Sequence, residues 1–314
     1  MAPVTALSGG SGVPDQGLAE VTARMRGAVR GRVNAARVTQ TFAAAVTGLI
    51  TVSVIAVAFA ILGVIVYRGI GAIDWTFLTA VPGPGMTTGG IGPVIAGTLW
   101  LVGVTALFAL PIGILAGVYL AEYAPKTLST RMIRLSITNM AGVPSIVYGL
   151  FGLALFVLAM NIGVSILAGA LTLTCMTLAV VITATEEALR QIPTDLRHAS
   201  LALGAGRWRT TYRVVLPAAA PGIMTGVILG LSRAAGETAP ILFTAVAFFV
   251  PRYPNSVFSK VMALPYHVYV LATQVPNPPE SVVWGTALVL VGMVTIVSVI
   301  AASWRSAQRR KVKW

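Results

Sequence analysis

Two charged residues, Arg233 and Glu237, stand in an otherwise apolar stretch of the sequence. A spacing of four places both side chains on one face of a helix, close enough to touch. A guanidinium offers a planar fork of donors that matches two oxygens of a tetrahedral oxyanion, and a carboxylate accepts a hydrogen bond from a protonated oxygen. Charges within an apolar helix are costly unless they face a partner or water. The pair therefore indicates either an internal salt bridge or an anion site on a permeation path.

The rest of the sequence offers little other chemistry. His198 and His267 are the only histidines, and they are too few and too far apart for a metal site. No Gly-x4-Gly-Lys-Ser/Thr phosphate loop occurs, and no nucleophile–base pair or pair of carboxylates has a catalytic setting. We therefore expect no enzyme activity, no bound metal and no cofactor on this chain.

The composition indicates a membrane protein rather than a soluble one. Apolar residues make up 56% of the 314 residues and charged residues only 10%, whereas soluble proteins carry roughly 25% charged residues. A spanning helix needs about 20 apolar residues. The charge-free intervals predict an all-α fold with six transmembrane helices, near residues 42–67, 94–120, 137–159, 164–185, 221–249 and 282–304.

The distribution of basic residues predicts the orientation of these helices. If both termini are cytoplasmic, 18 of the 22 Lys and Arg residues fall in inside segments, as the positive-inside rule expects. The net charge of +13 is then explained by orientation and by attraction to anionic lipid headgroups, and no basic-aromatic module suggests nucleic acid. We expect a basic, mobile cytoplasmic tail at 1–38, a permease domain at 39–304 and a second basic tail at 305–314.

The loop at 186–220, between the fourth and fifth spans, is longer than the other inside loops. Thr194 or Asp195 is suited to cap a short helix that ends at Gly204, and a second short helix from Trp208 to Val215 is expected to stop at Leu216-Pro217. Such a helical elbow exposes leucines and a tryptophan beside arginines. That surface suits a docking site for a soluble partner, although an amphipathic loop lying on lipid is the simpler alternative.

The elbow resembles the coupling loop of ABC-importer permeases. In that family Glu-Ala-Ala is followed at fixed spacing by Gly and then by Ile-x-Leu-Pro. The matching positions here are His198, Ala199, Ser200, Gly204, Leu216 and Pro217. His198 and Ser200 depart from the usual Glu and Ala, which affects any polar contact of the usual Glu but not the shape of the elbow.

Three further motifs resemble the phosphate-specific ABC importers, and within them the PstA permease family. The motifs are Gly89-Gly90-Ile91-Gly92-Pro93, Gly142-Val143-Pro144-Ser145-Ile146-Val147-Tyr148-Gly149 and Arg233-Ala234-Ala235-Gly236-Glu237-Thr238-Ala239-Pro240. The resemblance implies a type I (MetI-like) permease fold in the bacterial inner membrane. It also implies that Arg233 and Glu237 take part in moving phosphate, and that the elbow docks on an ATPase.

The same resemblance implies a set of partners. They are a second, PstC-like permease subunit, a PstB-like ATPase dimer that binds ATP and Mg, and a PstS-like external phosphate-binding protein. Two other functions stay open: a permease for another oxyanion, molybdate or sulfate, and a membrane scaffold that does not transport.

Four small or aromatic residues are candidates for a helix bend or for the pathway. Pro144 and Gly149 predict a kink that either lines the pathway or packs, and Tyr148 is as well suited to the core as to the pore. Gly236 allows close helix approach or a bend, and Pro240 weakens the helix one turn later.

Overall fold

The computed structural model describes the backbone of residues 15–311, with side chains for 39–300, 302, 303 and 306. Apart from two isolated bridges, the described elements are all helical. In chain order they are α1 (Asp15–Gly69), η1 (Ile70–Ala72), α2 (Trp75–Thr79), η2 (Pro84–Met86), α3 (Gly92–Val118), η3 (Tyr119–Tyr123), α4 (Leu128–Ala141), α5 (Ser145–Gly152), η4 (Leu153–Ala159), α6 (Ile166–Arg190), α7 (Thr194–Ala202), α8 (Arg207–Thr210), η5 (Thr211–Val215), α9 (Leu216–Gly236), α10 (Ala239–Thr244), α11 (Leu264–Thr273) and α12 (Glu280–Lys311).

Five helical segments of the described chain are long and apolar enough to cross a membrane. They are Thr39–Ala72, Gly92–Tyr123, Ile166–Arg190, Arg207–Gly236 and Glu280–Ile300. A sixth span results if the bent pair Leu128–Ala141 and Ser145–Ala159 counts as one. The predicted fold class, an all-α membrane protein with six spans, agrees with this architecture.

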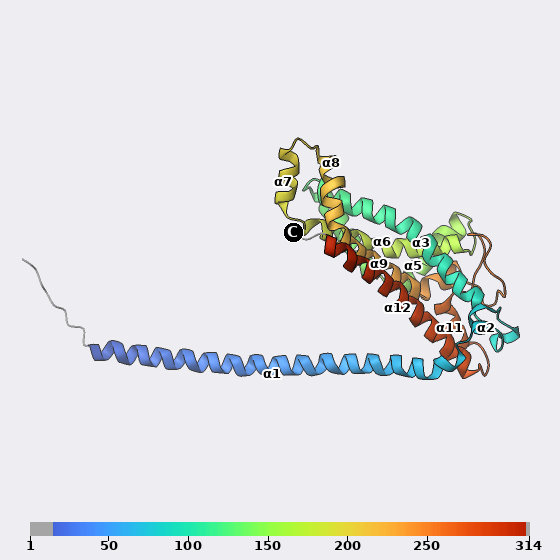
Figure 1. Ribbon diagram of the computed structural model, residues 1–314, viewed down its shortest axis with the longest axis horizontal. Coiled ribbons are helices and arrows are strands. Elements are labelled where there is room, and N and C mark those ends of the chain that lie inside the picture. Colours follow the sequence, from blue (N-terminus) through green and yellow to red (C-terminus); the bar gives the residue numbers. More distant parts are fainter. Residues whose placement is uncertain (1–14, 312–314) are drawn as a thin grey trace, which may run out of the picture. The chain divides into compact units, whose positions relative to one another are not determined.

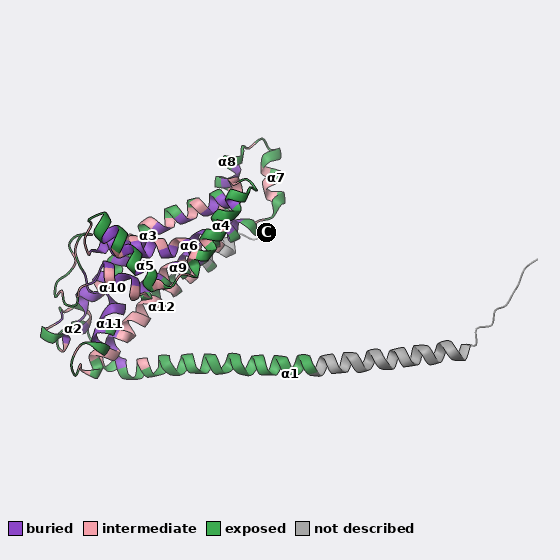
Figure 2. Cartoon of the chain, turned by 180° about the vertical axis from the view of Figure 1, so that it is seen from behind, coloured by how far each residue is buried: buried purple, intermediate pink, exposed green. Residues whose placement is uncertain are grey.

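The chain divides into two units, Met1–Gly63 and Val64–Trp314. In the first unit, residues 39–63 form part of α1, and every one of them is exposed (Figure 2). An apolar helix of this length requires apolar surroundings such as lipid. The predicted tail 1–38, and all of the predicted tail 305–314 except Ser306, lie outside the residues whose side chains are described.

The second unit is organised around α6. Helices α3, α6, α9 and α12 lie side by side in this order (Figure 1). Small residues permit the close packing: Cβ atoms at Gly222 and Gly226 of α9 would overlap the methyl groups of Ala188 and Ala184 of α6. Gly117 of α3 lies against Thr185 of α6 in the same way. Membrane helices associate through such contacts because no hydrophobic driving force acts between them in lipid.

The third predicted span, 137–159, is broken rather than straight. Helix α4 ends at Ala141 and α5 begins at Ser145, with a bend of 104° between the two segments. Gly142 and Pro144 occupy the break, and Pro144 takes the N-cap position of α5. Proline disfavours helical geometry in the residue before it and lacks an N–H, so the helix ends here.

The fifth span begins and ends earlier in the sequence than the predicted 221–249. It runs from Arg207 to Gly236, through Leu216-Pro217, where a helix end was predicted. The turn before the proline, η5, has π-helical hydrogen bonding, and Pro217 sits in the first turn of α9, where its missing N–H is tolerated. The predicted loop 186–220 is correspondingly shorter, because α6 continues to Arg190 and α8 begins at Arg207.

Candidate permeation and coupling sites

Arg233 and Glu237 make the contact that their spacing predicts. Arg233 Nε donates to Glu237 Oε1 at 3.1 Å. The Arg233 side chain is 44% exposed, whereas that of Glu237 is 17% exposed. Within the described part of the chain the Nη groups of Arg233 have no hydrogen-bond partner, so most of the donor fork remains available.

The pair lies at a helix break, not in the middle of a helix as predicted. Helix α9 ends at Gly236, and Glu237 has an extended backbone (φ −75°, ψ 129°) before α10 begins at Ala239. Pro240 lacks the N–H that would continue the helix and stands in the first turn of α10. In membrane proteins, broken helices of this kind are tolerated where they are buried in protein or line a water-filled cavity.

Two of the predicted bend and pathway residues lie in α5, which packs against α10, the helix that follows the Arg233–Glu237 pair. Gly149 of α5 lies against the backbone of α10, where a Cβ atom would come within about 3 Å of Ala239 O and Pro240 Cα. Tyr148 is buried, and its hydroxyl donates to Met140 O at 2.8 Å, across the break that Pro144 makes. Tyr148 is therefore a core residue that ties α5 to the end of α4. Gly236 is the last residue of α9, directly before the break, and a Cβ atom there would meet nothing within 4 Å among the described residues.

The elbow consists of α7, α8 and η5, and projects from one end of the second unit (Figure 1). We call this the elbow end, and the end with α2 and α11 the far end. Gly204 follows the end of α7 with φ +82°, a conformation that glycine adopts without steric cost. Ser200 and Thr210 hydroxyls hydrogen-bond at 2.9 Å and join α7 to α8.

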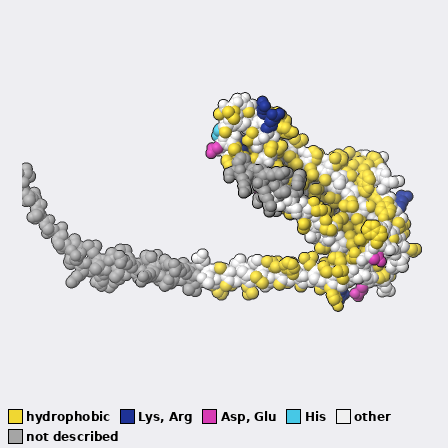
Figure 3. All heavy atoms as spheres, in the orientation of Figure 1, with side chains coloured by type: hydrophobic (Ala, Val, Ile, Leu, Met, Phe, Trp, Pro, Cys, Tyr) yellow, Lys and Arg dark blue, Asp and Glu magenta, His cyan; other side chains and the backbone are white. Residues whose placement is uncertain are grey.

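The elbow presents apolar side chains to its surroundings. Leu203 is 89% exposed and Trp208 69% exposed, and the Trp208 ring stacks on Tyr212. His198 and Ala199 are exposed, whereas Leu216 is partly buried and packs on the core formed by α6 and α9. Figure 3 shows Lys and Arg side chains gathered at this end, beside hydrophobic ones. This combination is suited to a protein partner with an apolar groove and acidic residues.

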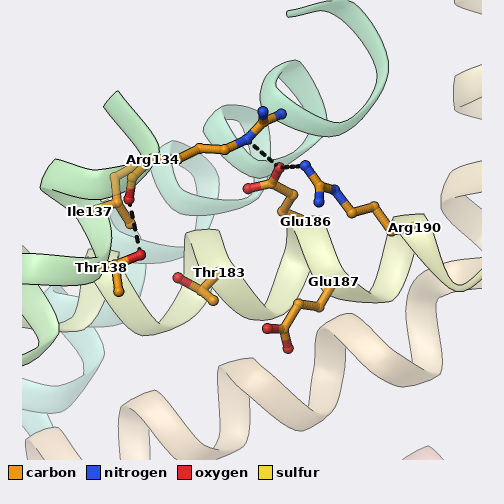
Figure 4. Close-up of a pocket in the computed structure, with 7 residues that line it drawn as sticks. All are labelled: Arg134, Ile137, Thr138, Thr183, Glu186, Glu187 and Arg190. Carbon is orange, nitrogen blue, oxygen red and sulfur yellow. Dashed lines mark hydrogen bonds and ion pairs between the residues drawn. The ribbon is translucent and has the colours of Figure 1, made fainter. Parts of the chain in front are cut away.

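Two ion-pair clusters near the elbow were missed by the sequence interpretation. Arg197 pairs with Glu122, and Glu186 accepts from both Arg134 and Arg190. Figure 4 shows the two arginines of the second cluster reaching Glu186 from different sides, while Glu187 points away. The available signal was that Glu122 and Glu186 are carboxylates at the ends of apolar runs, where an unpaired charge is costly.

The chain is similar to known transport proteins. Residues 109–314 match the family described as "Binding-protein-dependent transport system inner membrane component". A probable ABC transporter permease, YqgI of Bacillus subtilis, is 34% identical over 85% of this chain and 95% of its own length. The phosphate transport system permease protein PstA 1 of Mycobacterium tuberculosis is 37% identical over 80% of this chain and 83% of its own. A probable PstA of Methanocaldococcus jannaschii is 35% identical over 78% and 86%.

Solved structures share the fold. An inward-facing MetNI methionine ABC transporter chain superposes with a TM-score of 0.55 at 20% identity, over 68% of this chain and 93% of that one. A chain of a bacterial alginate importer gives 0.54 at 13% identity, over 70% and 79%. These matches support the predicted type I importer permease fold. With its helical architecture, family match and relatives, this chain belongs to the family of binding-protein-dependent transport system inner membrane components.

Proposed function

We propose that this chain is a permease subunit of an ABC importer that moves inorganic phosphate into the cell. The observation that carries the proposal is the Arg233–Glu237 pair at the break between α9 and α10 in a chain whose relatives include PstA proteins of the phosphate transport system. The Nη groups of Arg233 would bind two phosphate oxygens. The second oxygen of Glu237 would accept a hydrogen bond from the protonated oxygen of hydrogen phosphate, which sulfate lacks at neutral pH.

Transport requires partners that this chain lacks. In the proposal a second, homologous permease subunit completes the passage, and an external binding protein delivers phosphate at the far end. A soluble ATPase dimer binds ATP and Mg and docks on the exposed leucines and Trp208 of the elbow. With both termini and the elbow in the cytoplasm, ATP binding and hydrolysis would move the elbow and alternate the access of the passage.

Uptake by the reconstituted complex tests this function. The chain is purified with its associated subunits, placed in lipid vesicles and supplied with ATP, binding protein and labelled phosphate. We expect ATP-dependent phosphate uptake that excess unlabelled phosphate suppresses and excess sulfate or molybdate does not. Uptake of labelled sulfate or molybdate by the same vesicles in place of labelled phosphate would assign a different oxyanion. Absence of phosphate uptake, with an intact complex that hydrolyses ATP, would contradict phosphate as the substrate, and absence of labelled molybdate and sulfate uptake as well would contradict the permease role.

A further inference from the structure

The described residues include one short segment that contacts every part of the elbow. The turn η3, Tyr119–Tyr123, continues α3 with π-helical hydrogen bonding and contains the buried Leu120. We call this segment the transmission turn.

The strongest contact of the transmission turn is with α7. Arg197 Nη2 donates to Glu122 Oε1 at 2.7 Å, and Nε donates to the same oxygen at 3.2 Å. Both side chains are largely buried, 21% and 13% exposed. The remaining donors of Arg197 reach Leu189 O at 2.8 Å, in the last turn of α6, and Ile192 O at 2.7 Å, two residues after that helix ends. One guanidinium therefore joins α7, α6 and the end of α3.

The rest of the elbow also touches the transmission turn. Arg207 of α8 donates to Glu122 O at 3.2 Å, and the Tyr123 hydroxyl donates to Thr211 of η5 at 3.3 Å. On its other side, Arg134 of α4 donates to Leu120 O at 2.7 Å and to Glu186 of α6 at 2.7 Å. The turn thus lies between the elbow and three membrane helices, α3, α4 and α6.

These contacts connect the elbow to α3, a helix that is not its neighbour along the chain. Helices α6 and α9 follow the elbow through the chain itself, since α7 comes three residues after α6 and η5 continues into α9. Glu122, in the turn that follows α3, lies 75 residues from Arg197 in sequence. Helix α3 is therefore joined to the elbow by side-chain contacts and by its packing on α6 and α9.

We infer that the Arg197–Glu122 pair is the link through which movement of the elbow is transmitted to α3. Resting on the proposed function, the inference assigns to these two side chains a positioning role in coupling ATP hydrolysis to transport. Neither residue belongs to the proposed phosphate site at Arg233 and Glu237. A side chain with purely structural importance would affect stability or assembly, but not the amount of substrate moved for each ATP hydrolysed.

The test compares Glu122→Gln and Arg197→Lys with wild type in the vesicle complex. Glutamine keeps the shape of Glu122 without its charge, and lysine keeps the charge of Arg197 without the fork that reaches several acceptors. We expect both variants to assemble with the ATPase and to hydrolyse ATP. The ratio of phosphate taken up to ATP hydrolysed should fall by a factor of about 2 to 30. Glu187→Gln, an exposed carboxylate on the same end of α6, is the matched control and should keep the wild-type ratio.

A second measurement tests the link without assembly or transport. It therefore remains informative if the variants assemble poorly or if the wild type does not transport. Spin labels are placed at Leu115 of α3 and Asp195 of α7, both exposed, after replacing the single Cys175 with serine. Electron–electron distances in the full chain should be narrowly distributed for wild type and Glu187→Gln, and broader for Glu122→Gln. An unchanged uptake ratio in assembled variants, or an unchanged distance distribution, would overturn the link. A wild type without uptake would overturn the proposed function, and the distances would still decide the link.

Discussion

The Arg233 guanidinium donates from Nε to Glu237, and its Nη groups have no hydrogen-bond partner among the described residues. A structural salt bridge alone would be satisfied by this arrangement, but it would not need the helix to break directly after Gly236. The break separates the backbone of the carboxylate from the helix that holds the arginine. The charge of Arg233 is therefore needed either for the passage of phosphate or only for folding, and a substitution can distinguish the two.

Replacing Arg233 by glutamine answers that question. The change removes the charge and the fork while keeping a long polar side chain, so phosphate uptake should fall about 10- to 100-fold, as expected for lost hydrogen bonds to a charged group. Assembled protein should remain near the wild-type amount. Arg252→Gln, on an exposed loop, is the control and should transport normally. Normal uptake by Arg233→Gln would remove the residue from the passage.

His267 of α11, outside the candidate spans, gives a prediction for pH. Its side chain is 2% exposed, its Nδ1 has no partner among the described residues, and burial lowers its pKa to about 4. The unfolded chain, with a histidine pKa near 6.5, then binds more protons between these two values, so stability falls as the pH drops from about 6.5 to 4, by up to roughly 3 kcal/mol. Unfolding of the purified protein at several pH values across this range measures how steeply stability depends on pH. His267→Leu should flatten this dependence, and an equal slope in that variant would assign the effect to other groups.

Some of these side-chain contacts can be predicted from the sequence and others cannot. Arg233 and Glu237 are four residues apart, so helical geometry alone brings them together. Glu122 and Arg197 are far apart in sequence, and their pairing depends on how α3 and α7 meet in three dimensions. Local periodicity contains no information on how α3 and α7 pack together. The contacts of the transmission turn could therefore not be predicted from the sequence.

At the scale of elements, apolar runs located the membrane helices, but their breaks required structure. Pro144 was correctly interpreted as a kink, whereas Gly149 lies within α5 and not at the break, and the size of the bend, 104°, follows from packing of α5 against α10 and α6. The end of the fifth span was misplaced because hydropathy continues past Gly236, while Pro240 removes a hydrogen bond there. Charge-free length indicates that a segment is apolar, not that it is one continuous helix.

The glycines of α9 should be sensitive to size. In Gly226→Val the new side chain would overlap Ala184 of α6, and overpacking of this kind costs about 1–3 kcal/mol. A lower thermal midpoint of the purified protein in detergent is the expected result. Gly103→Val, on an exposed face of α3 with open space around it, is the matched control. Equal midpoints for both variants would mean that α6 and α9 are not closely packed.

The turn after α7 should be sensitive for a different reason. In Gly204→Arg a bulky side chain is forced into a left-handed conformation on the exposed elbow, so the ATPase should no longer co-purify while the chain still inserts in the membrane. Gly204→Asn is the control, because asparagine tolerates this conformation, and it should retain the ATPase. Normal recovery of the complex from Gly204→Arg would contradict docking at the elbow.

For the whole molecule, the separation of the elbow from the far end decides whether the proposed mechanism is possible. The elbow must face the ATP of the cytoplasm, and the far end must face the binding protein outside. The prediction uses single cysteines in a Cys175→Ser background at Leu203, on the elbow, and at Phe258, in the far-end loop, which are 89% and 63% exposed. In intact cells a membrane-impermeant thiol reagent should label the Phe258→Cys variant and not the Leu203→Cys variant, and permeabilised cells should show both. The basic residues support this direction, since positive loops are retained inside. Labelling of the Leu203→Cys variant from outside would place the elbow away from ATP, and a coupling role for it would then be untenable whatever the substrate.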